Sequence, residues 1–286
     1  MILRRSTRGR WLWIVPTVLL FLLVFLLAIS YTLPGSVILS LVRPFLAKSG
    51  FEISAETART EFPLGIRLEN AAFSRPGSGE LRLDTIRAGW EWTGLLRWLP
   101  VHVTVSKGDA KAQLYTSPRF WNPGKGQLLI ENVASEEFAS LLPLSASGAG
   151  FLLESAEARW SHSSSGAISG KGTARFAWLR VPIRQSSSPV REALLQDVQV
   201  LFAVQGKSLI VPSIAGTYEG AHVEGTGEIA ELFSPPEATI TFHLRIENPL
   251  EGKVAALFDL LAKNAKNANL RIRGPLLSPA GEFQFF

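Results

Sequence analysis

The stretch ATITFHLRIE, residues 238–247, alternates apolar and polar side chains along most of its length. Successive side chains of a β-strand point to opposite faces, so this alternation predicts a half-buried strand. One face would carry Ile240, Phe242, Leu244 and Ile246, which we expect to form part of a core or to line a groove. The other face would be polar, as is typical of an antiparallel sheet.

Similar alternation continues through most of the chain after Phe51, and turn residues such as Pro63, Gly108 and Pro123 separate the strands. An apolar inner face must be closed, covered or filled. We therefore expect a mainly β fold: a curled antiparallel sheet shaped as a half-open groove or taco, with one or two amphipathic helices against it. Helical patterns fall at Gly35–Gly50, Ser135–Pro143, Ser188–Leu195 and Leu250–Lys266.

Two Gly-Lys stretches resemble the end of a phosphate-binding loop. In QGKS, residues 205–208, Leu201 stands where the loop requires its first glycine, and strand-like residues follow instead of a helix. SGKGT, residues 169–173, has strand-like sequence on both sides. We predict a hairpin turn at the first and a strand at the second.

The N-terminal segment predicts a membrane anchor. Residues 11–31 contain no charged residue, and their helical length of about 31 Å matches the hydrocarbon thickness of a bilayer. A cleaved signal peptide is the alternative, with small residues at 28–30, but its apolar region would be shorter. The residues assigned to the anchor include Trp11, Trp13, Leu19, Phe21, Leu23, Phe25 and Tyr31.

Four arginines precede this segment: Arg4, Arg5, Arg8 and Arg10. They predict a cytoplasmic tail over residues 1–10 and a periplasmic β-rich domain over 32–286, with a sub-boundary near 143–150. Without these four, the 29 basic residues fall to 25 against 24 acidic ones (29 − 4 = 25). The folded part therefore lacks the basic excess typical of a nucleic-acid binder.

No catalytic or cofactor pattern emerges. The chain has no cysteine, and its four histidines lie far apart in the sequence without metal-ligand spacing. We predict no enzyme activity, no cofactor and no metal. The Trp-rich stretch GWEWTGLLRWLP, residues 89–100, is either core or a patch that contacts a membrane or a partner.

The order of these features resembles the type II secretion system protein N (GspN) family over nearly the whole chain. The likeness runs through the anchor, YTLPGSVILSLVRPFLAKSGFEI, FPLGIRLENAAFS and GELRLDTIRAGW. It is more specific in LIVPSIAGTYEGAHVEGTGEIAEL and in PLEGKVAALFDLLAKNAKNANLRIRGPLLSP. A broader group, the AsmA-like proteins, is also similar.

The resemblance implies a single-pass inner-membrane accessory protein of type II secretion, with other secretion components as partners. The alternative implied by the AsmA-like group is a protein that holds or transfers phospholipid at the periplasmic face. These motifs carry turns and strands and no catalytic residues, so neither function comes with named site residues.

Overall fold

The computed structural model describes residues 34–48, 52–61, 65–74, 79–91, 93–94, 98–117, 124–138, 148–162, 168–183, 191–232, 237–248, 266–276 and 278–285. It also describes the single positions Phe21, Val24, Ala28 and Ala255. Most of the expected anchor, the basic tail and nearly all of the expected helix over 250–266 lie outside the described residues.

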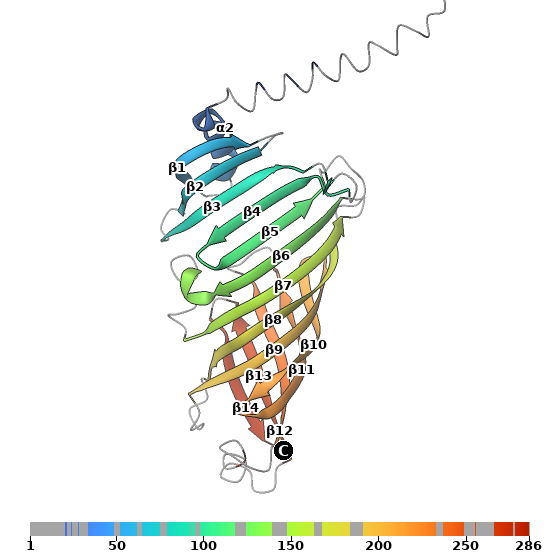
Figure 1. The fold of residues 1–286 in the computed structure, drawn as a ribbon. Helices are drawn as coiled ribbons and strands as arrows, with labels where there is room; N and C mark the ends of the chain where they lie inside the picture. The colour runs from blue at the N-terminus through green and yellow to red at the C-terminus, as the bar shows by residue number, and fades with distance from the viewer. Residues whose placement is uncertain are drawn as a thin grey trace, which may run out of the picture.

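The described residues form one antiparallel sheet of fourteen strands in which each strand pairs with the next along the chain. This confirms the predicted mainly β, antiparallel class; Figure 1 shows the strands succeeding one another from blue to red. The strands are β1 Glu52–Glu61, β2 Gly65–Ser74, β3 Glu80–Trp90, β4 Val101–Lys107, β5 Ala110–Thr116, β6 Lys125–Ala134, β7 Gly150–His162, β8 Ile168–Pro182, β9 Glu192–Gln205, β10 Ser208–Tyr218, β11 Ala221–Ala230, β12 Thr239–Glu247, β13 Asn267–Pro275 and β14 Ala280–Phe285.

Helix α2, Gly35–Lys48, forms where the sequence predicts it and contains Pro44. It lies against β1 at the start of the sheet (Figure 1). A single 3-10 turn, Ser135–Phe138, follows β6. Among the described residues, no helix has the length and apolar character needed to cross a membrane.

The prediction of a helix over Ser188–Leu195 is wrong for its second half, because Glu192–Leu195 belong to strand β9. In this strand Ala193 and Leu195 are almost fully buried, whereas Glu192 is exposed. The period-2 burial explains the difference: the sheet covers one side of the segment, and tertiary contacts override a local helical preference.

Both Gly-Lys stretches have the structures predicted for them. Gln205 pairs with Ser208 across a two-residue turn, in which Gly206 has a φ of 62°. A glycine with positive φ at the first turn position is typical of a type II′ hairpin. Residues 169–173 lie inside β8.

Three strand residues have a left-handed backbone: Asn70 with φ 50°, Asn132 with φ 54° and Asp197 with φ 49°. Asn and Asp are the non-glycine residues that tolerate this conformation best. Around Asn70 the buried positions step from Leu68 to Ala71, a spacing of three instead of two. Each such residue therefore re-aims the side chains that follow it and lets a long strand keep its apolar face on one side.

The apolar side chains gather into two separate cores. The N-terminal core joins Leu39 of α2 to buried residues of β1, β2 and β3. The C-terminal core is larger and takes its residues from the region between β8 and β14. There the sheet turns back on itself, because Ile183, just after β8, forms an isolated bridge with Gly281 of β14.

Candidate functional site

A single row of apolar residues crosses all fourteen strands. Each member is the ladder partner of the next, so their side chains share one face of the sheet. The row is Ala58, Leu68, Ile86, Val105, Ala112, Ile130, Ala156, Ala174, Val200, Ile214, Gly225, Leu244, Leu270 and Phe283.

Burial along this row is uneven. Leu68 and Ile86 are buried in the N-terminal core, and Leu244, Leu270 and Phe283 are buried in the C-terminal core. The members on β4, β5, β6 and β7 are only half-buried. Side chains of the neighbouring strands cover them partly. None of the described buried residues of the two cores lies on β4, β5, β6 or β7.

We call this half-buried part of the apolar face the central strip. It consists of Val103 and Val105 of β4, Ala112 and Leu114 of β5, Leu128 and Ile130 of β6, and Ala156 and Ala158 of β7. At about 4.8 Å between strands, the strip is about 14 Å wide from β4 to β7. It is an apolar surface between the two cores, with Val105 packed against the N-terminal one, and its chemistry suits an apolar ligand or the apolar face of a partner.

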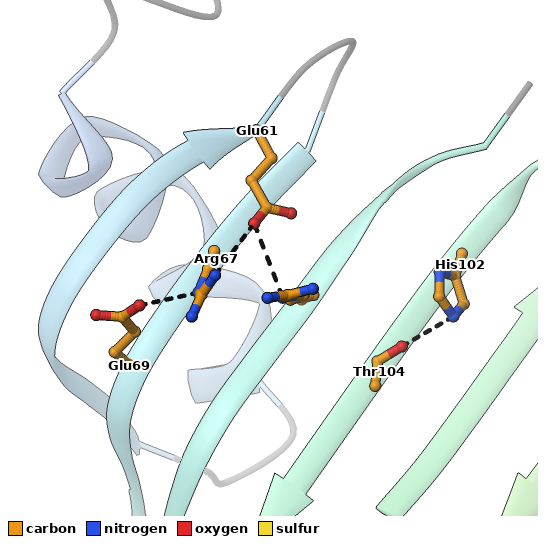
Figure 2. Close-up of polar contacts among 6 residues, drawn as sticks. Glu61, Arg67, Glu69, His102 and Thr104 are labelled. Carbon is orange, nitrogen blue, oxygen red and sulfur yellow. Dashed lines mark hydrogen bonds and ion pairs between the residues drawn. The ribbon is translucent and has the colours of Figure 1, made fainter.

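The opposite face of β3, β4 and β5 is polar and carries a hollow of about 530 Å³. We call it the polar hollow. Figure 2 shows the side chains of the same face of the sheet, from Glu61 and Arg67 to His102 and Thr104. The residues around the hollow are Glu61, Gly65, Thr85, Arg87, Ala88, Gly89, Trp90, Glu91, His102, Thr104, Ser106, Lys111 and Gln113.

His102 is the most constrained titratable residue of the polar hollow. Its ring stacks on Tyr115 with centroids 4.4 Å apart, and its Nε2 lies 2.8 Å from the hydroxyl of Thr104 (Figure 2). Burial lowers the pKa of His102; Glu91 opposes that effect and Lys111 adds to it. The stacking and the hydrogen bond fix the imidazole in place, and the lowered pKa favours its neutral form.

A short chain of ion pairs borders the hollow. Glu61 lies 4.0 Å from Arg67 and 3.8 Å from Arg87, while Arg67 Nε lies 2.9 Å from Glu69 (Figure 2). These side chains are about a third to a half exposed, so the pairs contribute little stability individually. Positive and negative charges alternate across β1, β2 and β3, which leaves this border without a strong net charge.

Within the described part of the chain, no group of three His, Asp or Glu side chains could hold a metal ion. In the polar hollow the hydroxyl of Thr104 lies 2.8 Å from Nε2 of His102, and the side chains around this pair are mostly charged or polar. Its arrangement supports binding of a polar group by hydrogen bonds. The prediction that the chain is not an enzyme stays a prediction.

The predicted site residues fall into two groups. Ile240, Leu244 and Ile246 are buried in the C-terminal core, and Phe242 packs against it from a half-buried position. Of the anchor residues, only Phe21 is described: it is helical and 72% exposed. Trp11, Trp13, Leu19, Leu23, Phe25 and Tyr31 lie outside the described residues, as do Arg4, Arg5, Arg8 and Arg10.

Sequence reasoning missed the polar hollow and the central strip. The alternation in VHVTVSKG, residues 101–108, predicts a strand, and His102 and Thr104 alternate there with valines. That alternation places two polar residues on one face, but it does not identify the residues of the adjacent strands that pair with them. The pairing of Gly89 with His102 and of His102 with Tyr115 depends on register, which only the structure reveals.

Compared with known protein families, with curated proteins and with solved structures, the chain matches none.

Proposed function

We propose that this chain is a non-enzymatic accessory component of the type II protein secretion system. In this proposal, residues 11–31 hold it in the bacterial inner membrane, and the sheet lies in the periplasm as a curled, taco-like platform. The resemblance of the sequence to the GspN family supports the proposal. The observation that carries it is the central strip, an apolar surface that neither core buries and that is suited to a binding partner.

The strip favours binding over catalysis for a physical reason. Apolar surface left in water costs about 25 cal/mol for each Å², and exposed contiguous patches commonly mark interaction sites. The C-terminal half of the same face is filled by its own side chains, with Leu270 and Leu244 almost fully buried. Partner binding is therefore expected on β4–β7 and not along the whole face.

Site-specific photo-crosslinking in the native host tests this proposal. A photoreactive residue at Leu114 or Leu128 would face the strip, whereas one at Gln113 or Gln127 would stand one position away on the polar face. We expect adducts with secretion-system proteins from the first pair and fewer from the second. Equal adducts from both faces, or unchanged protein export after deletion of the gene, would count against the proposal.

A second candidate function is holding phospholipid at the periplasmic face, as the AsmA-like resemblance implies. The apolar character of the strip favours it, because each acyl CH₂ buried there would contribute about 0.8 kcal/mol. The two filled cores at either end of the strip favour a holding site over an open channel. Other secretion components and phospholipid are thus the two proposed partners, and no nucleic acid is expected.

Mass spectrometry of lipid co-purified with the full chain tests this second candidate. Leu128→Glu places a charge on the strip, and Gln127→Glu places the same charge on the opposite face. We expect the first variant to lose bound phospholipid and the second to retain it. Lipid-free wild-type protein, or equal lipid in both variants, would contradict lipid holding and leave the secretion proposal to its own test.

A further inference from the structure

Trp98 is an exposed tryptophan in the segment between β3 and β4, which we call the Trp98 turn and of which the structure describes residues 91, 93–94 and 98–100. Its side chain is 64% exposed, and its backbone has a φ of 60°. A bulky residue in the left-handed region is strained, and such strain persists only where surrounding contacts hold it. Trp98 therefore combines a strained backbone with an aromatic ring that is largely exposed to solvent.

Backbone hydrogen bonds join the described residues of this turn. The amide of Leu99 donates to Gly94 O at 2.8 Å, and the amide of Glu91 donates to Pro100 O at 2.7 Å. Gly94 is buried, and a Cβ there would overlap the carbonyl of Leu99. Pro100 is among the fully buried side chains. The described residues near Trp98 are thus held by backbone hydrogen bonds and by burial.

A second hollow, of about 390 Å³, lies beside the turn. Leu99, the neighbour of Trp98, lines it together with Lys125, Gly126, Gln127, Arg159 and Trp160. The side chain of Arg159 is 69% exposed and pairs with Glu157 at 2.7 Å, and Lys125 is exposed. Aromatic rings next to cations suit the headgroup region of a membrane that contains anionic lipid.

The turn follows β3, a strand that shares a core with the helix next to the expected anchor. The predicted span ends at Tyr31 and α2 begins at Gly35, so at most about 14 Å of chain separates them. Leu39 of α2 shares the N-terminal core with Leu81, Leu83 and Ile86 of β3. The turn leaves from the end of β3 at Trp90, so it belongs to a strand that α2 links to the expected anchor.

From these features we propose that the Trp98 turn and the adjacent cationic hollow contact the surface of the same bilayer. Trp98 would lie among the headgroups, with Lys125 and Arg159 beside anionic phosphates. This contact rests on the membrane anchor of the proposed function. It goes beyond that function because it would define the orientation of the sheet relative to the membrane. For the Trp-rich stretch, residues 89–100, this proposal selects the membrane as the surface that the exposed part of the stretch contacts.

Single-cysteine fluorescence tests the contact, since the chain has no cysteine of its own. The full-length protein would carry an environment-sensitive dye at Thr93→Cys, an exposed position in the same turn. It would be reconstituted in vesicles of phosphatidylcholine with phosphatidylglycerol and quenched by nitroxides at headgroup depth. Ala28→Cys reports on the anchor, and Leu201→Cys, 51% exposed on the polar side of β9, is the aqueous control.

We expect quenching at 28 and 93 and none at 201. Trp98→Ser should remove the quenching at 93, whereas Trp98→Tyr, which keeps an interfacial ring, should retain most of it. Lys125→Gln and Arg159→Gln lie outside the turn and should each shift the contact equilibrium about fivefold toward the free state. High salt should have the same effect in the wild-type chain.

Quenching at 28 without quenching at 93 would overturn the contact and leave the anchor in place. Quenching at neither position would overturn the anchor and, with it, this contact. Quenching at 93 that survives both Trp98→Ser and high salt would also overturn the assignment, because it would not depend on the ring or the cations. A dye at 93 shielded by a protein in native membranes, but not in vesicles, would identify a protein partner instead.

Discussion

Phe242 of β12 lies across Gly227 of β11, its partner in the antiparallel ladder, and a Cβ on this glycine would overlap the phenyl ring. The same relationship joins Gly126 to Trp160 and Gly172 to Phe202. In each pair a glycine on the apolar face provides room for a large ring from the next strand. The pairing resembles the use of aromatics to cover glycines in β-sheets.

This relationship predicts that Gly227→Ala destabilises the protein, whereas a glycine-to-alanine change in a strand usually stabilises it. Alanine would normally stabilise a strand relative to glycine, but here its methyl group would displace the ring of Phe242. We expect the free energy of unfolding to fall by about 1–3 kcal/mol, as is typical of overpacking. Urea unfolding of the full chain in detergent would measure it. Thr226→Ala, next in sequence on the exposed face, is the control and should change stability little.

Two leucines on the apolar face should differ in the cost of truncation. Leu244 is 2% exposed in the C-terminal core, so Leu244→Ala should cost about 2–5 kcal/mol. Leu114 is half-buried in the central strip, and Leu114→Ala should cost about 1 kcal/mol or less because less buried surface is lost. Thermal or urea unfolding compares the two. Equal costs would mean that the strip is covered, and would remove the main support for a binding surface there.

Local pattern was enough to predict the strands but not how their faces are covered. Residues 238–247 fit a strand because one period-2 signal matches the pleat, and QGKS fits a turn because glycine allows positive φ. Asn132 and Asp197 gave no comparable signal, since an Asn or Asp in a strand has several uses. Leu114 and Leu244 look alike in sequence; only the long-range return of β14 to β8 makes one buried and the other half-exposed.

The left-handed residue of β6 allows a direct test of whether its backbone conformation determines the residue type at this position. Asn132 is exposed and has a φ of 54°. Asn132→Val should cost about 1–2 kcal/mol, because a β-branched residue is disfavoured in this conformation. Asn132→Gly should be neutral or stabilising, since glycine adopts it freely. Urea unfolding checks both, and equal destabilisation by the two variants would show that the side chain of Asn132 matters more than its backbone.

The pKa of His102 can be shifted in two opposite directions by substituting its charged neighbours. Burial lowers it below the ordinary value of 6.5, Glu91 raises it and Lys111 lowers it. Lys111→Gln should therefore raise the pKa of His102, and Glu91→Gln should lower it further. Proton NMR of the imidazole during a pH titration measures both shifts, and movement of the two variants in the same direction would contradict this account of the polar hollow.

The same shift sets the pH dependence of stability. Between the folded pKa and 6.5 the unfolded chain holds a proton on His102 that the folded chain does not, so acid favours unfolding in that window. The contribution of His102 is fully present above pH 6.5 and is lost as the pH falls toward the folded pKa. His102→Gln should flatten the stability curve between these values and leave its slope above pH 6.5 unchanged. An unchanged slope in this variant would mean that another group titrates there.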